Sequence, residues 1–416
     1  MSVEEICRRA QEASLQLARL PRLRKDEALT RMADALLRRR DEIMSDNAED
    51  VAAARADRLP DALLDRLLFD EQRMEDAVNA VYAVVSQADP VGQTARGWRL
   101  ANGMEVREIR VPLGVVAVVY ESRPHVTVDA AALCVKAGNA VVLRGGAAAK
   151  RTNRILAEVI EGAIIEAGLP QGAVSHLSTD RDELLSLLHQ SDTVDVVIPR
   201  GGGELHDYVQ AHSSVPVLYA TAGRCHIYVD AAADVAKAVK ICVNARCQRP
   251  GAGNSVHTIL VHGSIARRFL PALIKEFGSR GVETYGDKAT LDLAGEEAHL
   301  KRASRSHYEA EFVGTKVAIR MVSSLDEALE HIREFGNGHS EAIITENLTA
   351  AREFTARADS GCVYVNASTR FTDGTVFGLA GDLGVSTQKL HARGPLGLRE
   401  LTCGKYVVWG EGNVRM

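Results

Sequence analysis

The stretch VPLGVVAVVYESRPHVTVDAAALCVKAGNAVVLRGG, residues 111–146, decides the fold of this 416-residue chain. Its apolar run Val115–Tyr120 is typical of a strand buried on both faces of a parallel sheet. A helical segment follows at 127–138, and a second apolar strand begins at Ala140. A strand, a helix and a strand in this order predict a βαβ unit and a parallel sheet.

The same alternation extends outward from this stretch. Short apolar runs and helices of about ten to fifteen residues continue to about residue 220, and a second α/β cycle begins near Asp230. Residues 3–55 and 59–85 repeat apolar positions every three or four residues, which predicts a helical layer before the sheet. An Asn102-Gly103 turn between strand-like runs predicts a hairpin. We therefore expect two α/β domains built on doubly wound parallel sheets.

Composition excludes several classes of protein. Apolar residues make up 46% and charged residues 25% of the chain, which is the balance of a globular protein. The net charge of −5 gives no reason to expect a nucleic-acid partner. No run of about 18 apolar residues occurs and the N-terminus is acidic, so we expect no membrane span, no signal peptide and a cytoplasmic location. The seven scattered cysteines form no CxxC pair, which argues against a disulfide framework and a metal site.

Two glycine turns lie where strands are expected to end. Arg144, Gly145 and Gly146 follow one strand, and Arg200, Gly201 and Gly202 follow another. Free backbone N–H groups at such turns suit the phosphates or ribose of a cofactor. The alternative is that the glycines only permit a tight turn between a strand and a helix.

The segment 365–398 has almost no helical or strand periodicity and many glycines. A long irregular segment inside a compact domain is usually functional. Its cations Arg370, Lys389, His391 and Arg393 are candidates for binding an anionic substrate. A solvated surface loop is the alternative.

Taken in order, these motifs resemble the γ-glutamyl phosphate reductases, or glutamate-5-semialdehyde dehydrogenases, of the aldehyde dehydrogenase superfamily. The resemblance covers the whole chain. The motifs that carry it are VPLGVVAVVYESRP (111–124), VTVDAAALCVKAGNAVVLRGG (126–146), IPRGG (198–202), CHIYVD (225–230), NARCQRPG (244–251), HSEAIIT (339–345), VYVNASTRFTDG (363–374), FGL (377–379) and STQKLHARGPLGL (386–398).

The resemblance implies an α/β, aldehyde dehydrogenase-like fold with three parts. We expect N-terminal helices and a cofactor-binding domain at 1–230, with an oligomerisation hairpin at 97–110. A catalytic domain at 231–398 and a C-terminal return segment at 399–416 follow. The family reaction reduces L-glutamyl 5-phosphate to glutamate 5-semialdehyde with NADPH in proline biosynthesis. A cysteine thiolate forms a thioester that is then reduced. A homo-oligomer, either dimer or tetramer, is implied.

The cofactor and substrate motifs carry over with gaps. Arg144 and its two glycines match the family's cofactor turn, but the polar and acidic pair that normally follows is Ala147-Ala148. Arg123 matches the ESRP motif, whereas the residue after Pro124, usually Asn, is His125. With Arg249 and the four cations of 365–398, Arg123 and His125 complete the expected substrate-binding set. Retention of NADP(H) is left open.

The nucleophile position is the largest departure from the family pattern. Relatives read Cys-Asn where this chain reads Gly253-Asn254, so the resemblance implies a vacated nucleophile position. Loss of a nucleophile can cost on the order of a millionfold in rate. Cys247, six residues earlier, is a possible substitute, although a small residue at a helix end is the alternative. Cys225, beside a histidine, is expected to be structural.

Three functions therefore stay open. In the first interpretation, the chain is a reductase whose nucleophile has moved or whose hydride transfer is direct. Alternatively, it performs non-redox acyl transfer or hydrolysis, with water or an amine in the volume freed at Gly253. In the third interpretation it is a catalytically silent partner of a glutamate kinase-like enzyme.

Overall fold

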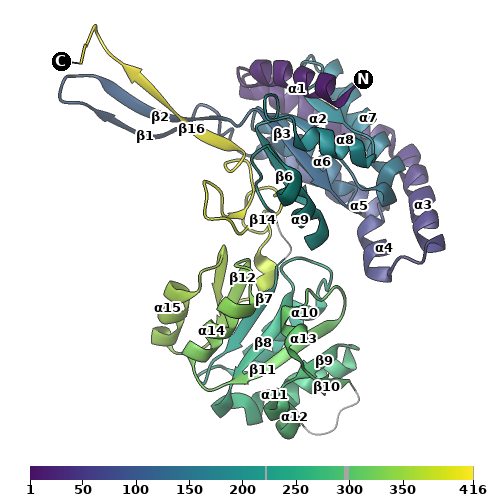
Figure 1. Cartoon of the computed structure of the whole chain (residues 1–416), viewed down its shortest axis with the longest axis vertical. Coiled ribbons are helices and arrows are strands. Elements are labelled where there is room, and N and C mark those ends of the chain that lie inside the picture. The colour runs from purple at the N-terminus through teal and green to yellow at the C-terminus, as the bar shows by residue number, and fades with distance from the viewer. Residues whose placement is uncertain (221–222, 295–298, 416) are drawn as a thin grey trace. The chain divides into compact units, whose positions relative to one another are not determined.

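A computed structural model describes residues 1–220, 223–294 and 299–415 (Figure 1). The contacts divide the chain into two units. Unit 1 consists of Met1–Ala220, Gly378–Gly384 and Gln388–Met416, and unit 2 consists of Thr221–Phe377 and Val385–Thr387.

The boundary between the units differs from the expected one at residue 230. Strand β7 (Cys225–Val229) pairs with β8 and β12 in the sheet of unit 2, so the second unit begins before this strand. Most of 378–398 joins unit 1 instead of the expected catalytic domain, because Ala380, Leu383 and Leu396 are buried in the apolar core of unit 1. The domain limits predicted from sequence are wrong at these two places.

Unit 1 opens with the expected helical layer. Each helix buries the apolar positions that recur every three or four residues, and the side chains of Ser2 and Asp70 cap the first and fifth helices. The bounds are α1 Val3–Leu17, α2 Arg22–Arg38, α3 Arg40–Ala56, α4 Asp61–Leu67 and α5 Glu71–Ser86.

The described residues of unit 1 contain a four-stranded parallel sheet in the order β5-β4-β3-β6. The chain runs from β3 outward to β5 and then returns to the other side of β3, so the strand order reverses between β3 and β6. Ligands of open α/β sheets bind beyond the carboxyl ends of strands at such a point. The bounds are β3 Val115–Tyr120, α6 His125–Lys136, β4 Ala140–Arg144, η1 Ala147–Ala149, α7 Lys150–Glu166, β5 Val174–His176, α8 Arg181–Leu188, β6 Val196–Arg200 and α9 Gly203–His212.

The predicted hairpin forms an antiparallel sheet with the C-terminal segment of the chain (Figure 1). Strands β1 (Thr94–Arg99) and β2 (Glu105–Pro112) flank the Asn102-Gly103 turn, and Gly103 has a φ of +86°. Strand β16 (Thr402–Trp409) pairs along the whole of β2. The hairpin is therefore longer than the expected 97–110.

Within the described residues, unit 2 is built on a seven-stranded sheet in the order β10-β9-β11-β8-β7-β12-β13, and the paired strands are parallel. The strand bounds are β8 Val256–His262, β9 Glu283–Gly286, β10 Leu300–Arg302, β11 Lys316–Val322, β12 Ser340–Ile344 and β13 Cys362–Val365. The helices are α10 Val235–Cys247, α11 Gly263–Ser279, α12 Lys288–Ala294, α13 Arg305–Glu309, α14 Leu325–Phe335, α15 Leu348–Arg357 and η2 Thr369–Phe371. The short strands β14 (Val385–Ser386) and β15 (Gly394–Pro395) interrupt an otherwise irregular segment, as expected for 365–398.

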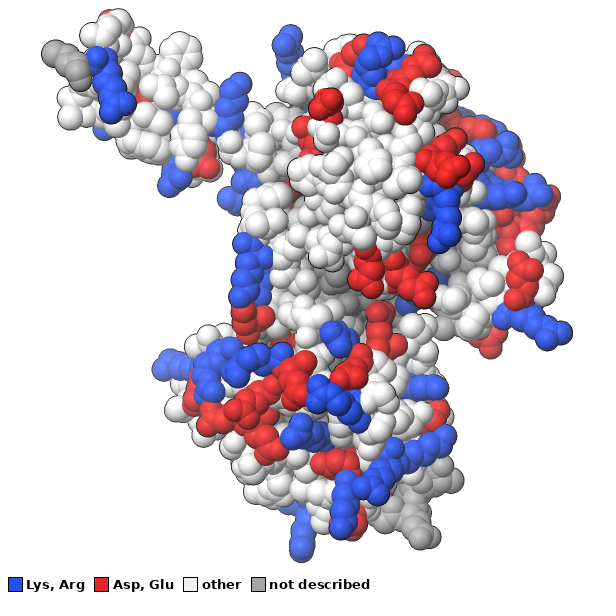
Figure 2. Space-filling model, in the orientation of Figure 1, with Lys and Arg blue, Asp and Glu red and all other residues white. Residues whose placement is uncertain are grey.

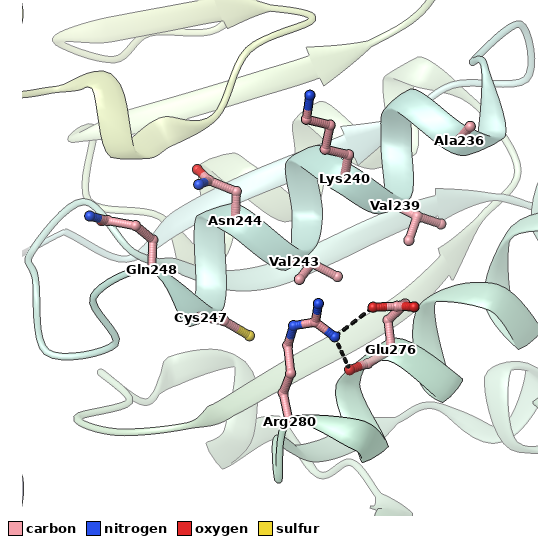
Figure 3. Close-up of a pocket in the computed structure, with 9 residues that line it drawn as sticks. All are labelled: Ala236, Val239, Lys240, Val243, Asn244, Cys247, Gln248, Glu276 and Arg280. Atoms are coloured by element: carbon pink, nitrogen blue, oxygen red, sulfur yellow. Dashed lines mark hydrogen bonds and ion pairs between the residues drawn. The ribbon is translucent and has the colours of Figure 1, made fainter.

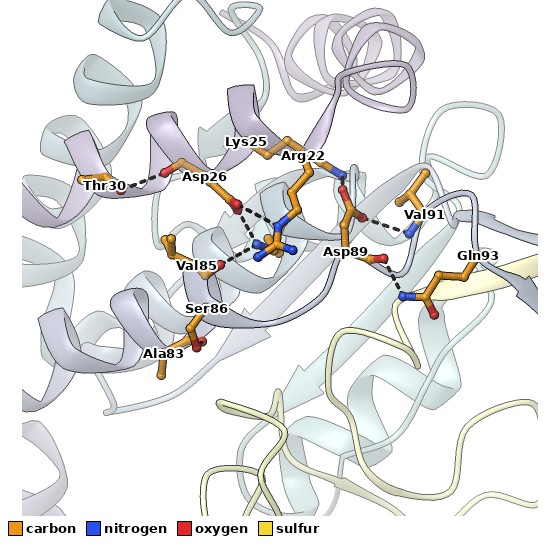
Figure 4. A network of polar contacts seen from close by, with 11 residues as sticks. Arg22, Lys25, Asp26, Thr30, Ala83, Val85, Ser86, Asp89, Val91 and Gln93 are labelled. Carbon is orange, nitrogen blue, oxygen red and sulfur yellow. Dashed lines mark hydrogen bonds and ion pairs between the residues drawn. The ribbon is translucent and has the colours of Figure 1, made fainter.

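Buried lysines tie the helical layer of unit 1 together (Figure 4). Lys25, on α2, is fully buried and its Nζ lies 2.5 Å from a carboxylate oxygen of Asp89. Lys136, on α6, is also fully buried and donates to the carboxylate of Asp26 and to the carbonyl of Val85. Because an unpaired buried charge is costly, these ion pairs fix the helices against one another.

Charged side chains of both signs are interspersed on the visible face of each unit (Figure 2). Arg22, Arg31 and Arg39 illustrate this mixture, since each pairs with an acid three or four residues away. These exposed pairs contribute little to stability. Among the described residues, no helix has both the length and the apolar character needed to cross a membrane.

Candidate functional site

The loop that carries Gly253 lies at the amino edge of the sheet of unit 2, directly before β8. Strands β7 and β8 are neighbours, and their first residues, Cys225 and Val256, are paired. The N–H of Gly223, just before β7, donates to the carbonyl oxygen of Gly253 at 2.8 Å. Gly253 itself is partly exposed. The Gly253 loop is thus held against the start of β7.

Asn254 fastens this loop to the irregular segment that follows β13. Its side-chain Nδ2 donates to the carbonyl oxygen of Thr372 at 2.7 Å and to that of Arg370 at 3.3 Å. Asn254 is 6% exposed, and its Oδ1 has no hydrogen-bond partner among the described residues. A buried acceptor without a donor is unusual and marks a place where a ligand or water completes the site.

A thiol and an imidazole meet beneath the Gly253 loop. The Sγ of Cys225 lies 3.6 Å from the carbonyl oxygen of Gly253 and 3.7 Å from Nδ1 of His339. Both side chains are buried. Burial, and secondarily the carboxylate of Glu341, raises the pKa of the Cys225 thiol, whereas the cation of Arg370 lowers it.

A chain of hydroxyl groups continues from this imidazole. His339 Nδ1 lies 2.8 Å from the hydroxyl of Ser340, which is 2.7 Å from that of Thr372. The hydroxyl of Tyr364 lies 2.7 Å from the same Thr372 oxygen. Since hydroxyls both donate and accept, this chain can orient the imidazole and relay a proton from it.

Two arginines of the predicted substrate set come together beside this loop. Arg370 donates from Nε to the side chain of Gln248 at 2.9 Å. Burial lowers the pKa of the Arg370 guanidinium, and the positive charge of Arg249 lowers it further, against the opposing effect of the Asp373 carboxylate. Two cations that repel one another create a place where a bound anion is stabilised.

A third arginine, which the sequence analysis did not single out, fixes the Gly253 loop from below. Arg246 is fully buried on α10 and donates to the carbonyls of Pro250 at 2.9 Å and Val256 at 2.8 Å, which lie at the two ends of the loop. The same guanidinium reaches the carbonyls of Phe312 and Gly314. Arg246 therefore sets the path of the backbone on which Gly253 lies.

Cys247, the substitute thiol predicted from sequence, lines a groove between α10 and α11 (Figure 3). The groove has a volume of about 620 Å³ and is also lined by Val243, Lys240 and Arg280. Arg280 is paired with Glu276 of α11 at 2.5 Å. Burial raises the pKa of the Cys247 thiol, against the lowering effect of Arg280 and Arg246. The thiol with a hydrogen-bond contact to the Gly253 carbonyl oxygen is Cys225, and the role of Cys247 as a substitute stays a prediction.

The two arginines of the glycine turns in unit 1 are directed into the protein. Arg144 donates to the carbonyl of Thr179 at 2.7 Å, and burial lowers its pKa. Burial also lowers the pKa of Arg200, against the opposing effect of the Asp382 and Asp129 carboxylates. The Arg144 guanidinium thus has a structural partner, whereas the buried Nε of Arg200 has no hydrogen-bond partner among the described residues.

Carboxylates of the chain occupy helix N-termini beside both turns. The N–H of Gly202, at the start of α9, donates to Glu121 at 2.9 Å, and that of Thr152, in the first turn of α7, donates to Asp50 at 2.9 Å. These two amides are therefore not available to a phosphate, contrary to the expectation of free N–H groups. The glycines have packing reasons as well: a Cβ on Gly201 would lie 2.4 Å from the Glu121 carboxylate.

The remaining predicted residues all lie in unit 1. Arg123 follows β3, and His125 begins α6. His391 lies 3.2 Å, by its Nε2, from the carbonyl oxygen of Glu400, and Lys389 and Arg393 flank it along the chain. Of the expected substrate-binding set, unit 2 contains only Arg249 and Arg370.

Comparison with known proteins identifies the family. The sequence profile of the aldehyde dehydrogenase family matches residues 1–292. This chain belongs to the aldehyde dehydrogenase family. It is 47% identical over 409 residues to the γ-glutamyl phosphate reductase of Heliobacterium modesticaldum, which covers 98% of this chain and 97% of the relative. It is 46% identical over 414 residues to that of Thermobifida fusca, covering 99% and 98%.

Solved structures agree with this assignment. The crystal structure of γ-glutamyl phosphate reductase from Thermotoga maritima is 39% identical, covers 100% of both chains and has a TM-score of 0.94. An acetylating aldehyde dehydrogenase from Geobacillus thermoglucosidasius, at 19% identity and a TM-score of 0.73, shares the fold. The aldehyde dehydrogenase fold and membership among the γ-glutamyl phosphate reductases, both predicted from sequence, are confirmed. Aldehyde dehydrogenases generally use NAD(P).

Sequence reasoning missed four residues in this aldehyde dehydrogenase chain that matter for the site: Cys225 as a contact of Gly253, His339, Arg246 and Glu121. Three of them carried a usable signal, since Cys225 opens the motif CHIYVD, His339 opens HSEAIIT and Glu121 opens ESRP. Arg246 lies within the motif NARCQRPG, but the sequence does not reveal that it is buried.

Proposed function

We propose that this chain is an acyl-phosphate reductase that converts L-glutamyl 5-phosphate to glutamate 5-semialdehyde with NADP(H). Its relatives of 43–47% identity over nearly their whole length bear the name γ-glutamyl phosphate reductase. The observation that carries the proposal is the position of two cations near the Gly253 loop: Arg370 is hydrogen-bonded to Gln248 and lies within electrostatic range of Arg249. They match the doubly charged phosphate of such a substrate.

The residues of unit 2 then take separate roles. Arg249 and Arg370 bind the phosphate and stabilise the charge that develops on it as it leaves. Asn254 and Arg246 hold the loop on which Gly253 lies. The position of Gly253 corresponds, by resemblance, to the cysteine of relatives, so another group must attack the acyl carbon or the hydride must reach it directly.

NADP(H) is proposed as the cofactor, at the carboxyl edge of the sheet in unit 1. When bound, it supplies the hydride. Gly145 and Gly146 after β4, together with Gly201 and Gly202 after β6, bring backbone without side chains to that edge. The phosphates must be held by groups other than the Gly202 and Thr152 amides, which are bonded to Glu121 and Asp50. Arg144 and Arg200 stabilise the loops around this edge.

A second candidate is non-redox acyl transfer or hydrolysis at the same anion site. The observation that favours it is the occupied helix N-termini of α7 and α9, together with Ala147 and Ala148, which offer no side chain to bind a ribose. In that reaction water or an amine attacks the acyl carbon and phosphate leaves.

One experiment separates the candidates. Glutamate semialdehyde, phosphate and NADP⁺ are supplied to the native chain, Cys247→Ala and Gly253→Cys, and nicotinamide reduction is followed. The proposal expects turnover in the native chain and in Cys247→Ala. Turnover only in Gly253→Cys would show that the native chain has left this reaction. A second assay supplies the acyl phosphate and NADPH. If phosphate is released without nicotinamide oxidation, the non-redox candidate replaces the reductase.

We also propose that the chain assembles as a homo-oligomer, dimer or tetramer, through the sheet of β1, β2 and β16. The apolar side chains of Trp98, Tyr406, Val408 and Trp409 on this sheet are exposed. Analytical ultracentrifugation of the native chain and of a chain lacking 402–416 tests this proposal. The same number of subunits in both assemblies would contradict it.

A further inference from the structure

We propose that Cys225, with His339 as its base, is the thiol that attacks the acyl phosphate in this chain. The inference rests on the proposed function and names the group that replaces the absent cysteine. Three observations in unit 2 support it: the position of the thiol, the way it is covered, and the charges that face it.

The position follows from strand order. Strand β7 lies between β8 and β12, so its first residue, Cys225, is flanked by the loop before β8 and the loop before β12. These loops carry Gly253 and His339. The sulfur is consequently 3.6 Å from the Gly253 carbonyl oxygen and 3.7 Å from the His339 Nδ1. A nucleophile and a base within hydrogen-bond reach are the requirement for an activated thiol.

Backbone atoms of two glycines lie close to the thiol. A Cβ on Gly223 would lie 2.6 Å from each of the Cys225 Sγ, the Gly253 carbonyl oxygen and a ring carbon of His339. These three groups therefore converge on a residue that has no side chain. The N–H of the buried Gly223 donates to the same Gly253 carbonyl oxygen at 2.8 Å, and Gly253 is partly exposed. An acyl phosphate would therefore approach the thiol from the side of Gly253.

The charges around the thiol suit an acyl phosphate. Arg370 favours the thiolate of Cys225, and Arg370 and Arg249 are close enough to affect one another. Asn254, the neighbour of Gly253, has the unpartnered Oδ1 described above. Burial and the carboxylate of Glu341 nevertheless raise the pKa of the free thiol, so the thiol must give its proton to His339 as it attacks.

The step balances in atoms and electrons. The Cys225 proton passes to His339 Nδ1 and the sulfur electron pair forms a bond to the acyl carbon. The bond from that carbon to the phosphate oxygen breaks, and phosphate leaves with the electron pair. Cys225 then holds the acyl carbon as a thioester, to which a bound NADPH would supply the hydride. Cleavage of the C–S bond would release the aldehyde, and His339 would return the proton to the Cys225 thiolate.

Acylation of the intact chain by acetyl phosphate, without NADPH, tests the inference. Peptide mapping by mass spectrometry is expected to place an acetyl thioester on Cys225. His339→Gln is expected to slow its formation by about 100-fold, the lower range for loss of a general base. Cys242 is the matched control, because it is an equally buried thiol among apolar neighbours. Cys242→Ala should leave the rate unchanged.

The outcomes keep the two proposals apart. Cys225→Ser removes the thiol but keeps a side chain of similar shape, and Cys225→Ala removes the thiol entirely. Circular dichroism checks that both variants fold. Absence of acyl-Cys225 in the native chain overturns the inference. So does reductase turnover that survives in Cys225→Ser, although the proposed function then stands. If the native chain forms the thioester on Cys225 but does not reduce that thioester with NADPH, the proposed reductase function is wrong and the inference holds.

Discussion

Replacing Arg246 by Met is expected to destabilise unit 2 selectively. The guanidinium is fully buried and donates to four carbonyls, those of Pro250, Val256, Phe312 and Gly314. Each hydrogen bond to a charged donor contributes roughly 1.5–3 kcal/mol, and the cost of burying the cation offsets part of the sum. Four carbonyls left without donors should therefore lower the free energy of unfolding by about 3–5 kcal/mol.

Urea unfolding followed by circular dichroism measures this loss. With a slope of about 2 kcal/mol per molar urea, the midpoint of the unit 2 transition should fall by about 2 M. Arg246→Lys keeps the charge but not the planar fork, so it should recover only part of the loss. Arg280→Met is the control, because Arg280 makes a solvent-exposed pair with Glu276 that contributes about 1 kcal/mol or less. If Arg246→Met shifts the midpoint no further than this control, the role assigned to the buried guanidinium is wrong.

Three further predictions concern stability. Burial lowers the pKa of His331 to about 2, so below pH 6.5 the unfolded chain binds a proton that the folded chain excludes. As the pH falls from 6.5 to 4, His331 should therefore lower the free energy of unfolding by about 1.4 kcal/mol per pH unit. Urea unfolding at a series of pH values measures this dependence, and His331→Gln should remove the contribution of His331. Lys136→Met should lower the free energy of unfolding by about 3 kcal/mol, because the Asp26 carboxylate loses its buried partner. The double variant Lys136→Met/Asp26→Leu should lose less than the sum of the two single changes. Asp50→Asn should cost about 1–2 kcal/mol in chemical unfolding, because the Thr152 amide and hydroxyl lose a charged acceptor at the start of α7; no loss would show that the cap is dispensable.

The fold was predictable because local patterns determine it. Val115–Tyr120 is apolar at every position, and all six residues are buried in β3. The Asn102-Gly103 turn supplies the backbone conformation that a hairpin requires. The domain boundary was not predictable in the same way. The apolar run 225–229 reads as a buried strand whether it ends one sheet or begins the next, and only its pairing with β8 and β12 decides between them.

The site was harder to predict because its contacts are long-range. Cys247 lies close to Gly253 in sequence, which made it the natural candidate for a substitute thiol. The contact is made instead by Cys225, 28 residues from Gly253 and 114 residues from His339 along the chain. Neighbouring parallel strands bring such residues together, and no periodicity within a single segment encodes which strands will be neighbours.

Where this chain binds an anion can be tested independently of any turnover. In unit 1, the Gly202 and Thr152 amides at the helix N-termini already bind the Glu121 and Asp50 carboxylates. In unit 2, burial and then the positive charge of Arg249 lower the pKa of Arg370, against the effect of the Asp373 carboxylate, so a bound anion would stabilise the charged guanidinium.

Calorimetric titration of the native chain with inorganic phosphate should therefore detect binding that Arg370→Gln weakens by about 10–100-fold, the loss of one charge-assisted contact. Arg144→Gln is the comparison, since its guanidinium bonds to the Thr179 carbonyl, and it should leave phosphate affinity unchanged. Equal losses in the two variants would place the anion at the glycine turns after all. Affinity that does not fall with added salt would show that the interaction is not between charges.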